Sequence, residues 1–465
     1  MFDILGPGGV LALLVLGGVI GFVVLFRFPE LMIAVLLVGQ GFIHFAFKLM
    51  GMQVSRVGFA VAGSVLFLPM VVLLVLGRVM GKGRGQQEPP FFGRASGMFI
   101  LMLLALGLLL TAGLGYTHAP IYGGKKVREF LTFGVGPFFL AFLFIRDLKS
   151  VRRLMWWTML MAGFFVGISV LYSVKTTGQL FTSIRYGEGT FLGPFEVYSG
   201  LELGVRMVVF FQSLLVMGWA ARHRVWRVAV TPVLLFIAAA VMSAGARSAL
   251  LGIFLLVPMT VKMLYRGRWG VPAIGAGLLL LVMAGYFVWA PESAKERFIE
   301  PLTGKGSAAV SIERRSGAFG TAARMIVSRP IQGYGTGGFA MEFEKLDIET
   351  YAHNMWLSVW AENGVFGFGL VMGMWIMLGL HLWRSYRAVP SGTIMFYAVC
   401  WVAGLVVAEF VNDLVHYDIA HAASTFLLVS GIALKIVALN DHEMSLKKAD
   451  HPTSSLQAGK LRMRD

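Results

Sequence analysis

The pattern of apolar and polar positions is dominated by apolar stretches of about twenty residues, separated by short polar connections. In helical conformation, about twenty apolar residues cross a hydrocarbon core of roughly 30 Å. The pattern therefore predicts an all-α polytopic membrane protein with about 12–13 transmembrane helices. The expected helices are residues 10–26, 31–50, 57–77, 97–115, 130–145, 154–174, 197–218, 228–244, 248–264, 271–289, 354–380, 393–411 and 419–438.

Basic residues gather in alternate connections, which orients the expected helices. By the positive-inside rule, the clusters face the cytoplasm, and they are Arg78/Lys82/Arg84, Arg146/Lys149/Arg152/Arg153, Arg222/Arg224/Arg227, Lys262/Arg266/Arg268, Arg384/Arg387 and the tail after Lys435. The longest remaining connection then lies outside. We expect four parts: a transmembrane bundle over 1–289, an external loop domain over 290–353, C-terminal transmembrane helices over 354–440 and a disordered cytoplasmic tail over 441–465.

Composition supports this class and excludes several others. Hydrophobic residues make up 57% of the chain and charged residues 14%, with a mean hydropathy of +0.76, which a soluble domain could not keep in water. The net charge of +16 follows membrane topology, so we expect membrane lipid and no nucleic acid as a partner. The single cysteine, Cys400, excludes an intramolecular disulfide and a cysteine metal cluster. We expect neither a metal nor a cofactor.

The connection over 290–353 is predicted to fold as a helical cap. Phe319, Ala323, Ile326 and Val327 recur at helical spacing. Arg329-Pro330 predicts the end of that helix, and the glycines that follow predict a flexible turn.

Three features on the expected external side carry candidate chemistry. They are Arg247, the pair Arg314/Arg315, and His353-Asn354 where the chain re-enters the membrane. Arginines at a bilayer boundary are costly to desolvate unless they meet an anion, and guanidinium groups match phosphate oxygens bidentately. Asn354 is a good helix N-cap, and His353 can accept a proton near neutral pH. A pyrophosphate would suit this combination.

Each residue also has a structural interpretation. Arg247 alone could anchor a helix end at the lipid headgroups. Arg314 and Arg315 adjoin Glu313 and could form a solvated surface pair. His353 could fill the boundary between cap and membrane.

Further charged residues are ambiguous. Glu362 is expected to orient a neighbouring group rather than to react. Glu202 and Arg206 lie at i and i+4 and could neutralise each other. Lys125, Lys126 and Arg128 lie on the outer side, where they could attract anionic lipid or a diphosphate, although solvated charge is the simpler account. Glu409, Asn412, Asp413, His416 and Asp418 could line an acceptor entrance or cap helix ends.

Several strings resemble one family. Tyr351–Leu357, continuing to Glu362–Gly367, is similar to the His-Asn, Leu, Glu-x-Gly-x-x-Gly signature of the O-antigen ligase and polymerase superfamily. The preceding segment, Arg315–Gly335, resembles the family's Arg, aromatic, then Pro-x-x-Gly-x-Gly segment, with Phe319 in place of the usual Trp. Gly245–Gly252 resembles its small-residue Ser-Arg helix start.

The resemblance implies transfer of a glycan from an undecaprenyl pyrophosphate-linked donor to a sugar or lipid A-core acceptor. It further implies a metal-independent inverting enzyme of the bacterial inner membrane, with a glycosyltransferase family C-like fold and a periplasmic lid. Arg247 and Arg315 would stabilise the leaving pyrophosphate, and His353 would deprotonate the acceptor hydroxyl. Candidate substrate-binding residues are Arg314, Asn354, Glu362, Lys125 and Arg206.

Alternatives remain open from the sequence. A ligase that joins finished polymer to lipid A core and a polymerase that extends polysaccharide use the same donor chemistry. A secondary transporter or lipid flippase is suggested by intramembrane Glu202, Glu409 and Asp413, but two related halves with matching broken helices are not evident. A membrane scaffold would tolerate loss of Arg247 and His353.

Overall fold

The structure is a computed structural model that describes residues 27–38, 94–177, 200–220, 224–243, 247–266, 306–415 and 419–450, with isolated positions between 277 and 288. Within these residues every regular element is helical, so the predicted all-α class is confirmed. The expected spans at 10–26 and 57–77 lie outside the described residues.

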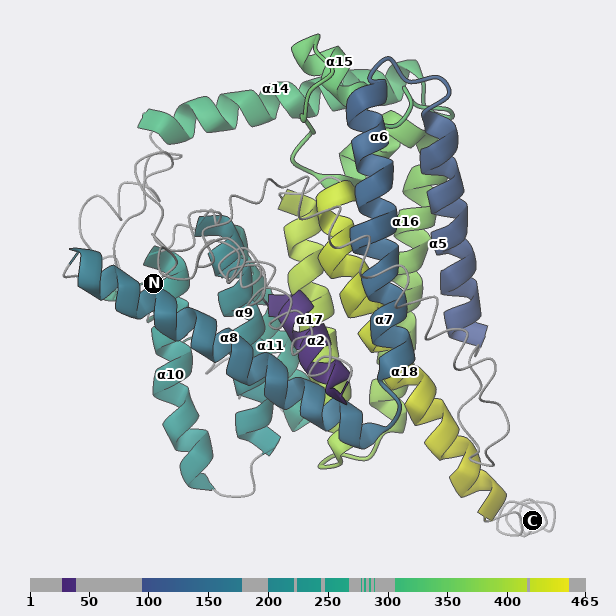
Figure 1. The fold of residues 1–465 in the computed structure, drawn as a ribbon. Coiled ribbons are helices and arrows are strands. Elements are labelled where there is room, and N and C mark those ends of the chain that lie inside the picture. Colours follow the sequence, from purple (N-terminus) through teal and green to yellow (C-terminus); the bar gives the residue numbers. More distant parts are fainter. Residues whose placement is uncertain are drawn as a thin grey trace, which may run out of the picture.

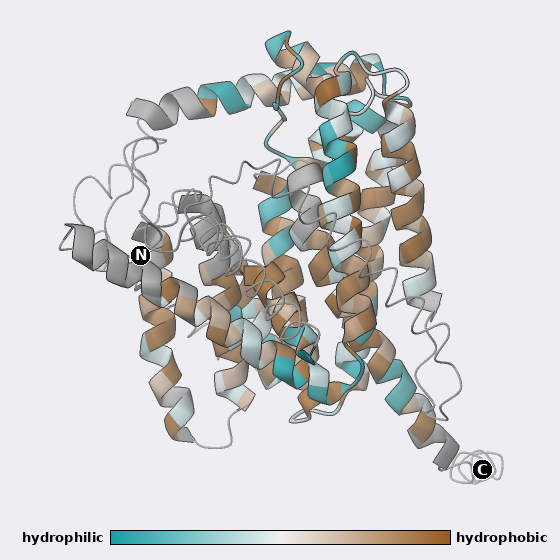
Figure 2. Cartoon of the chain, viewed as in Figure 1, coloured by the Kyte–Doolittle hydropathy of each residue, from teal (hydrophilic) through white to brown (hydrophobic). Residues whose placement is uncertain are grey.

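Five helical segments of the described chain are long and apolar enough to cross a membrane: Ser96–Gly113, Pro120–Phe144, Met355–Ala388, Ile394–Val415 and Thr425–Leu446. Shorter apolar helices accompany them at Pro29–Val38, Met207–Ala220, Ala229–Ala239 and Ala249–Tyr265. The helices stand side by side in a bundle whose surfaces are largely hydrophobic along the middle of their length (Figures 1 and 2). The chain is a multi-pass membrane protein, as the hydropathy pattern predicted.

The first hairpin of this bundle begins with α5, Arg94–Gly113. The chain returns through α6, Pro120–Glu129, the π-helical turn η1, Phe130–Val135, and α7, Gly136–Phe144. The sequence predicted a span from 130 to 145 only, so its start was wrong. α6 begins ten residues earlier, with proline at its first helical position, where proline is common. The lysines of this stretch are typical of a loop, but here they form ion pairs with carboxylates.

A second group of helices follows in the chain. It comprises α8, Leu148–Thr177, α9, Gly200–Ala220, α10, Arg224–Ser243, and α11, Arg247–Tyr265. α9 is bound to the centre of the bundle by Gln212, whose Nε2 donates to the carbonyls of Cys400 at 2.9 Å and Trp401 at 3.1 Å. The hydroxyl of Thr260 on α11 donates to Gln212 Oε1 at 3.2 Å. One buried amide therefore joins three helices, which satisfies its polar atoms in a region without water.

The C-terminal helices form the centre of the molecule. They are α16, Met355–Ala388, α17, Ile394–Val415, and α18, Ile419–Asp450, while α2, Pro29–Val38, packs on α8. α18 continues into the segment predicted as a disordered tail, because no Gly or Pro interrupts the chain before Pro452.

Two further helices lie at one end of the bundle. α14, Gly306–Ser328, runs across the ends of the transmembrane helices, and α15, Gly338–Glu344, lies above its C-terminal part (Figure 1). We call residues 306–353 the lid. The face of α14 that packs on α15 and α16 contains Ala318, Ala322 and Met325.

Of the apolar residues whose spacing predicted this helix, Ile326 packs against the same cluster, but Phe319 and Val327 do not. Phe319 is 38% exposed and Val327 is 81% exposed, so these residues do not form the packed side. Small alanines allow α14 to approach its neighbours closely, whereas hydropathy alone favours larger apolar side chains for a buried face.

The opposite end of the bundle carries the basic clusters. There, the Arg266 guanidinium donates to the Val389 carbonyl, and Tyr386 OH donates to the Met263 carbonyl at 3.1 Å. A cavity of about 170 Å³ at this end is lined by residues from the start of α8, the α16–α17 connection and the last turns of α18. The ends of α11 and α16, the starts of α8 and α17 and the C-terminal part of α18 therefore lie on the side away from the lid.

Candidate functional site

The lid end of α16 is built around Asn354. Its Oδ1 accepts a hydrogen bond from Leu357 N at 3.0 Å, which confirms the predicted N-cap. Its Nδ2 donates to the carbonyl of Leu414 at 2.8 Å, near the end of α17. One side chain thus joins the start of α16 to the end of α17. The unpaired N–H groups of the first turn and the positive end of the helix dipole face this place.

His353 immediately precedes this cap. Its φ of +52° is in the left-handed region, which non-glycine residues seldom occupy. The imidazole is half-buried and lies 4.7 Å, between ring centroids, from the ring of Tyr351. Ala352 N donates to Ser358 Oγ at 3.3 Å, which further holds the chain as it enters α16. An unusual backbone conformation held by its surroundings is a feature found at functional sites.

Buried carboxyl groups occupy the last turns of α17. Glu409 is 2% exposed and Asp413 is fully buried. Neither oxygen of Asp413 has a hydrogen-bond partner among the residues that the structure describes. Asp413 directly precedes Leu414, whose carbonyl accepts a hydrogen bond from Asn354, so this part of α17 lies close to the start of α16. His416 and Asp418 lie outside the described residues, and no metal-binding group of three or more His, Cys, Asp or Glu occurs within them.

The two adjacent arginines of α14 differ in their surroundings. Arg314 has a side chain that is 62% exposed, and its Nη2 forms an ion pair with Glu344 of α15 at 2.5 Å. Arg315 is half-buried. The sequence left open which arginine faces a site, and the structure gives Arg314 a carboxylate partner within the lid.

Arg247 is the first residue of α11. The last turn of α11 meets the end of α16, where Tyr386 binds Met263. Because a helix of this length crosses most of the bundle, its first residue lies at the lid end, on the side where α16 begins. The side chain of Arg247 is outside the described part.

Arg206 lies in the half of α9 nearer the lid. The last turn of α9 places Trp219 4.8 Å, between ring centroids, from Tyr265 at the opposite end of the bundle, so α9 begins toward the lid. The side chains of Arg206 and Glu202 are outside the described part, so their predicted pairing stays a prediction.

The glycine-rich segment after α14 is a close-packed connection. Tyr334 N donates to the Ala361 carbonyl at 3.0 Å, and Val365 N donates to the Pro330 carbonyl at 2.9 Å. Both bonds surround a kink in α16 at Gly364, which has φ +64°. A Cβ at Gly364 would lie 1.9 Å from the Ile331 carbonyl oxygen. The predicted flexible turn is therefore a rigid joint between the lid and α16.

A buried ion pair lies directly beneath this joint. Lys126 Nζ is 2.8 Å from Glu362 Oε1, with side chains 0% and 1% exposed. Glu362 therefore orients a basic partner, as expected, but the partner is a lysine from α6. The simpler expectation that Lys126 is solvated is wrong, because α16 and the lid cover it. Lys125, by contrast, is 31% exposed and pairs with Glu349 of the lid.

Asp347 supplies the missing cap of α6. Its two carboxylate oxygens accept hydrogen bonds from Ile121 N and Tyr122 N, each at 2.8 Å. The acidic group stabilises the helix N-terminus although it comes from more than two hundred residues away in the chain. Sequence reasoning named Lys126 only as a solvated charge or a group that attracts anions, and it did not name Asp347, since neither residue lies in a motif.

Comparison with known protein families finds a match that includes much of this region. The family model described as O-antigen ligase matches residues 232–372, which run from within α10 through α11, α14 and α15 into α16. No curated protein matches the chain.

Proposed function

Because residues 232–372 belong to the O-antigen ligase family, we propose that this chain moves a glycan from undecaprenyl pyrophosphate to an acceptor sugar hydroxyl at the periplasmic face. The family supports a membrane enzyme of the O-antigen ligase or polymerase type. The identity of the donor, the identity of the acceptor and the membrane face of the reaction are our proposal.

One observation carries the proposal: the chain enters α16 through His353 and Asn354 at the end of the bundle where α11 also begins with Arg247. The lid lies at this same end and carries Arg315 on α14. A helix N-terminus and arginine side chains are suited to bind a diphosphate. His353 is half-buried, has a positive φ and lies where the lid joins α16.

In the proposed reaction, Arg247 and Arg315 bind the diphosphate of the donor. His353 takes the proton from the acceptor hydroxyl, whose oxygen attacks the anomeric carbon opposite the pyrophosphate. The bond between that carbon and the phosphate oxygen breaks, and undecaprenyl pyrophosphate leaves. Negative charge grows on the leaving oxygen during this step, so the arginines stabilise the transition state more than the bound donor. Attack on the opposite face inverts the anomeric centre.

Charge distribution supports the proposed orientation. The basic residues Arg266, Arg384 and Arg387 belong to the end of the bundle away from the lid. Positive residues favour the cytoplasmic side, so the lid would face the periplasm of a bacterial inner membrane. The basic residues near the lid include Lys125 and Lys126, which are neutralised by carboxylates.

A transfer assay tests the proposal. Purified protein in lipid nanodiscs is given a lipid-linked glycan donor and a lipid A-core acceptor, without an ion gradient. We expect product from the wild type and a loss of about 10²-fold or more for Arg247→Ala, Arg315→Ala and His353→Ala. Arg152→Ala, an exposed change at the far end, is the matched control.

If His353→Ala keeps near-normal turnover at normal protein levels, His353 is not the base. A requirement for an ion gradient, with no glycosyl product, would favour a transporter. Ligase and polymerase are separated in a deletion strain, because a polymerase is needed for long polymer on the carrier lipid, whereas a ligase is needed only for its appearance on lipopolysaccharide.

A further inference from the structure

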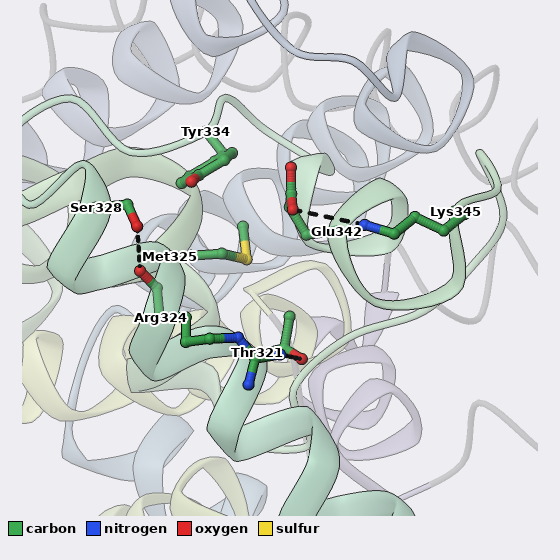
Figure 3. A pocket seen from close by; sticks show the side chains of 7 residues that line it. All are labelled: Thr321, Arg324, Met325, Ser328, Tyr334, Glu342 and Lys345. Carbon is green, nitrogen blue, oxygen red and sulfur yellow. Dashed lines mark hydrogen bonds and ion pairs between the residues drawn. The ribbon is translucent and has the colours of Figure 1, made fainter.

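The lid contains a cavity that the proposed reaction does not use. It has a volume of about 270 Å³ and lies between the C-terminal half of α14 and α15 (Figure 3). Tyr334, from the joint between these helices, forms a further part of its wall. Its size is just below the roughly 300 Å³ at which pockets for drug-sized ligands begin, so it suits a ligand of one or two rings.

The cavity faces away from Arg315. Arg324, which lines it, follows Arg315 by nine residues on the same helix. Nine residues are two and a half helical turns, so the two arginines project from opposite sides of α14. They are also separated by about 13 Å along the helix axis. A ligand in this cavity is therefore not the diphosphate that Arg315 is proposed to bind.

The polar groups of the cavity are paired with one another within each helix or its end. Arg324 Nη2 donates to Thr321 Oγ1 at 2.8 Å, and the Ser328 hydroxyl donates to the Arg324 carbonyl at 2.7 Å. Lys345 lies 3.8 Å from the carboxylate of Glu342. Figure 3 shows Arg324, Thr321 and Ser328 on one side of the cavity and the pair of Glu342 and Lys345 on the other. The Lys345 side chain is 75% exposed and that of Glu342 is 36% exposed, so a ligand can reach these groups from solvent.

The aromatic side of the cavity is the ring of Tyr334, a residue whose backbone is bonded to α16. Tyr334 is anchored by its backbone to Ala361, and the Arg329 guanidinium lies 4.7 Å from the centre of its ring. Thr321 and Met325 are 6% and 2% exposed and form the more buried part of the lining. An aromatic ring beside hydroxyl, guanidinium and carboxylate groups offers both an apolar surface and hydrogen bonds.

This mixture of groups selects among ligand classes. A lipid tail would meet charged side chains, and a simple anion would meet the carboxylate of Glu342. The hydroxyls of a sugar ring can donate to the Glu342 carboxylate and accept from the Arg324 guanidinium. The apolar faces of the ring can pack against Tyr334.

We propose that the lid cavity binds one sugar unit of the glycan chain, several units away from the sugar that reacts. The inference rests on the proposed function, because it takes the glycan as the substrate. The position of the cavity across α14 from Arg315 requires a chain long enough to pass around the helix. The lid would then favour long glycans over short ones.

The test measures binding of free polysaccharide, released from the host's carrier lipid by mild acid and separated by size. It lacks the diphosphate, so its binding does not depend on the donor site. The full-length protein in nanodiscs is used, with the variants Arg324→Gln and Glu342→Gln. We expect the wild type to bind long fractions more tightly than single repeat units, and each variant to lose about tenfold in affinity for the long fractions.

Two controls make the result specific. Glu313→Gln is the same chemical change on an exposed part of α14 that does not line the cavity, and it should leave binding unchanged. Arg315→Ala should lower transfer by about 10²-fold or more yet retain polysaccharide binding. Absence of binding by the wild type, or equal binding by the cavity variants, would overturn the sugar site while leaving the proposed transfer reaction to its own assay. Loss of binding in Glu313→Gln would also refute it.

Discussion

The ion pair between Lys126 and Glu362 allows a quantitative test of how the lid end of the bundle is held together. The two charges are 2.8 Å apart and at most 1% exposed. At an effective dielectric constant of about 20, Coulomb's law gives an attraction of about 6 kcal/mol at this 2.8 Å separation. Desolvation of both groups offsets most of that attraction, so the pair as a whole contributes little net stability.

Removing one partner has a much larger effect than removing both. Glu362→Gln leaves the Lys126 ammonium in a buried position without its carboxylate, and we expect the free energy of unfolding to fall by about 3–5 kcal/mol. Lys126→Met should cost a similar amount for the converse reason. The double variant Lys126→Met/Glu362→Gln leaves no buried charge, so it should recover most of the loss.

The assay is thermal unfolding of purified protein in detergent, followed by tryptophan fluorescence, with the rank order of midpoints as the result. Lys125→Met is the comparison, because its pair with Glu349 is partly exposed and should contribute less than about 1 kcal/mol. A double variant as unstable as the sum of the single variants would refute the reasoning, since the two charges would then not be coupled.

Three further predictions concern the backbone and the helix ends. Gly364→Ala should destabilise the protein by at least about 2–3 kcal/mol, because φ is positive and the new Cβ would overlap the Ile331 carbonyl; Gly369→Ala, on the same helix with open space around it, should have no such effect in the same thermal assay. Asp347→Ala removes the cap of α6 and should cost about 1 kcal/mol, visible as faster amide hydrogen exchange at Ile121 and Tyr122, whereas unchanged exchange there would contradict the capping role. Burial opposes ionisation of Asp147, but the hydrogen bonds from Ser150 and the charges of Arg153 and Lys149 outweigh it and lower the pKa. A lowered pKa stabilises the fold above the ordinary carboxyl pKa and is lost as pH falls through the folded value, so the small deficit of Asp147→Asn, under about 1 kcal/mol, should be present at pH 7 and absent in acid.

Much of the architecture follows from local sequence pattern. The apolar segments of α5, α16 and α17 are long enough to require a membrane whatever their neighbours are. The cap at Asn354 and the end of α14 before Pro330 also depend on nearby residues only, and both were predicted correctly. Motif order likewise sufficed to find the resemblance to the O-antigen ligase family, whose model matches residues 232–372.

The candidate site was predictable only in part. His353 and Asn354 are adjacent, so their joint position at the start of α16 was expected. The partner of Glu362 was not expected, because Lys126 is 236 residues away and nothing in its own neighbourhood distinguishes it from Lys125. The cavity of the lid combines residues from α14, the glycine joint and α15, and it arises only once these pack.

The sequence by itself determined the helical class, the membrane setting, the resemblance of one region to a family and the helix ends that have local signals, since each depends on local pattern. Only the tertiary structure decided which face of α14 is buried, why Lys125 and Lys126 are tolerated in α6, and why the glycine segment is rigid. These properties depend on contacts between distant segments, where fit and charge compensation outweigh the preferences of any single stretch.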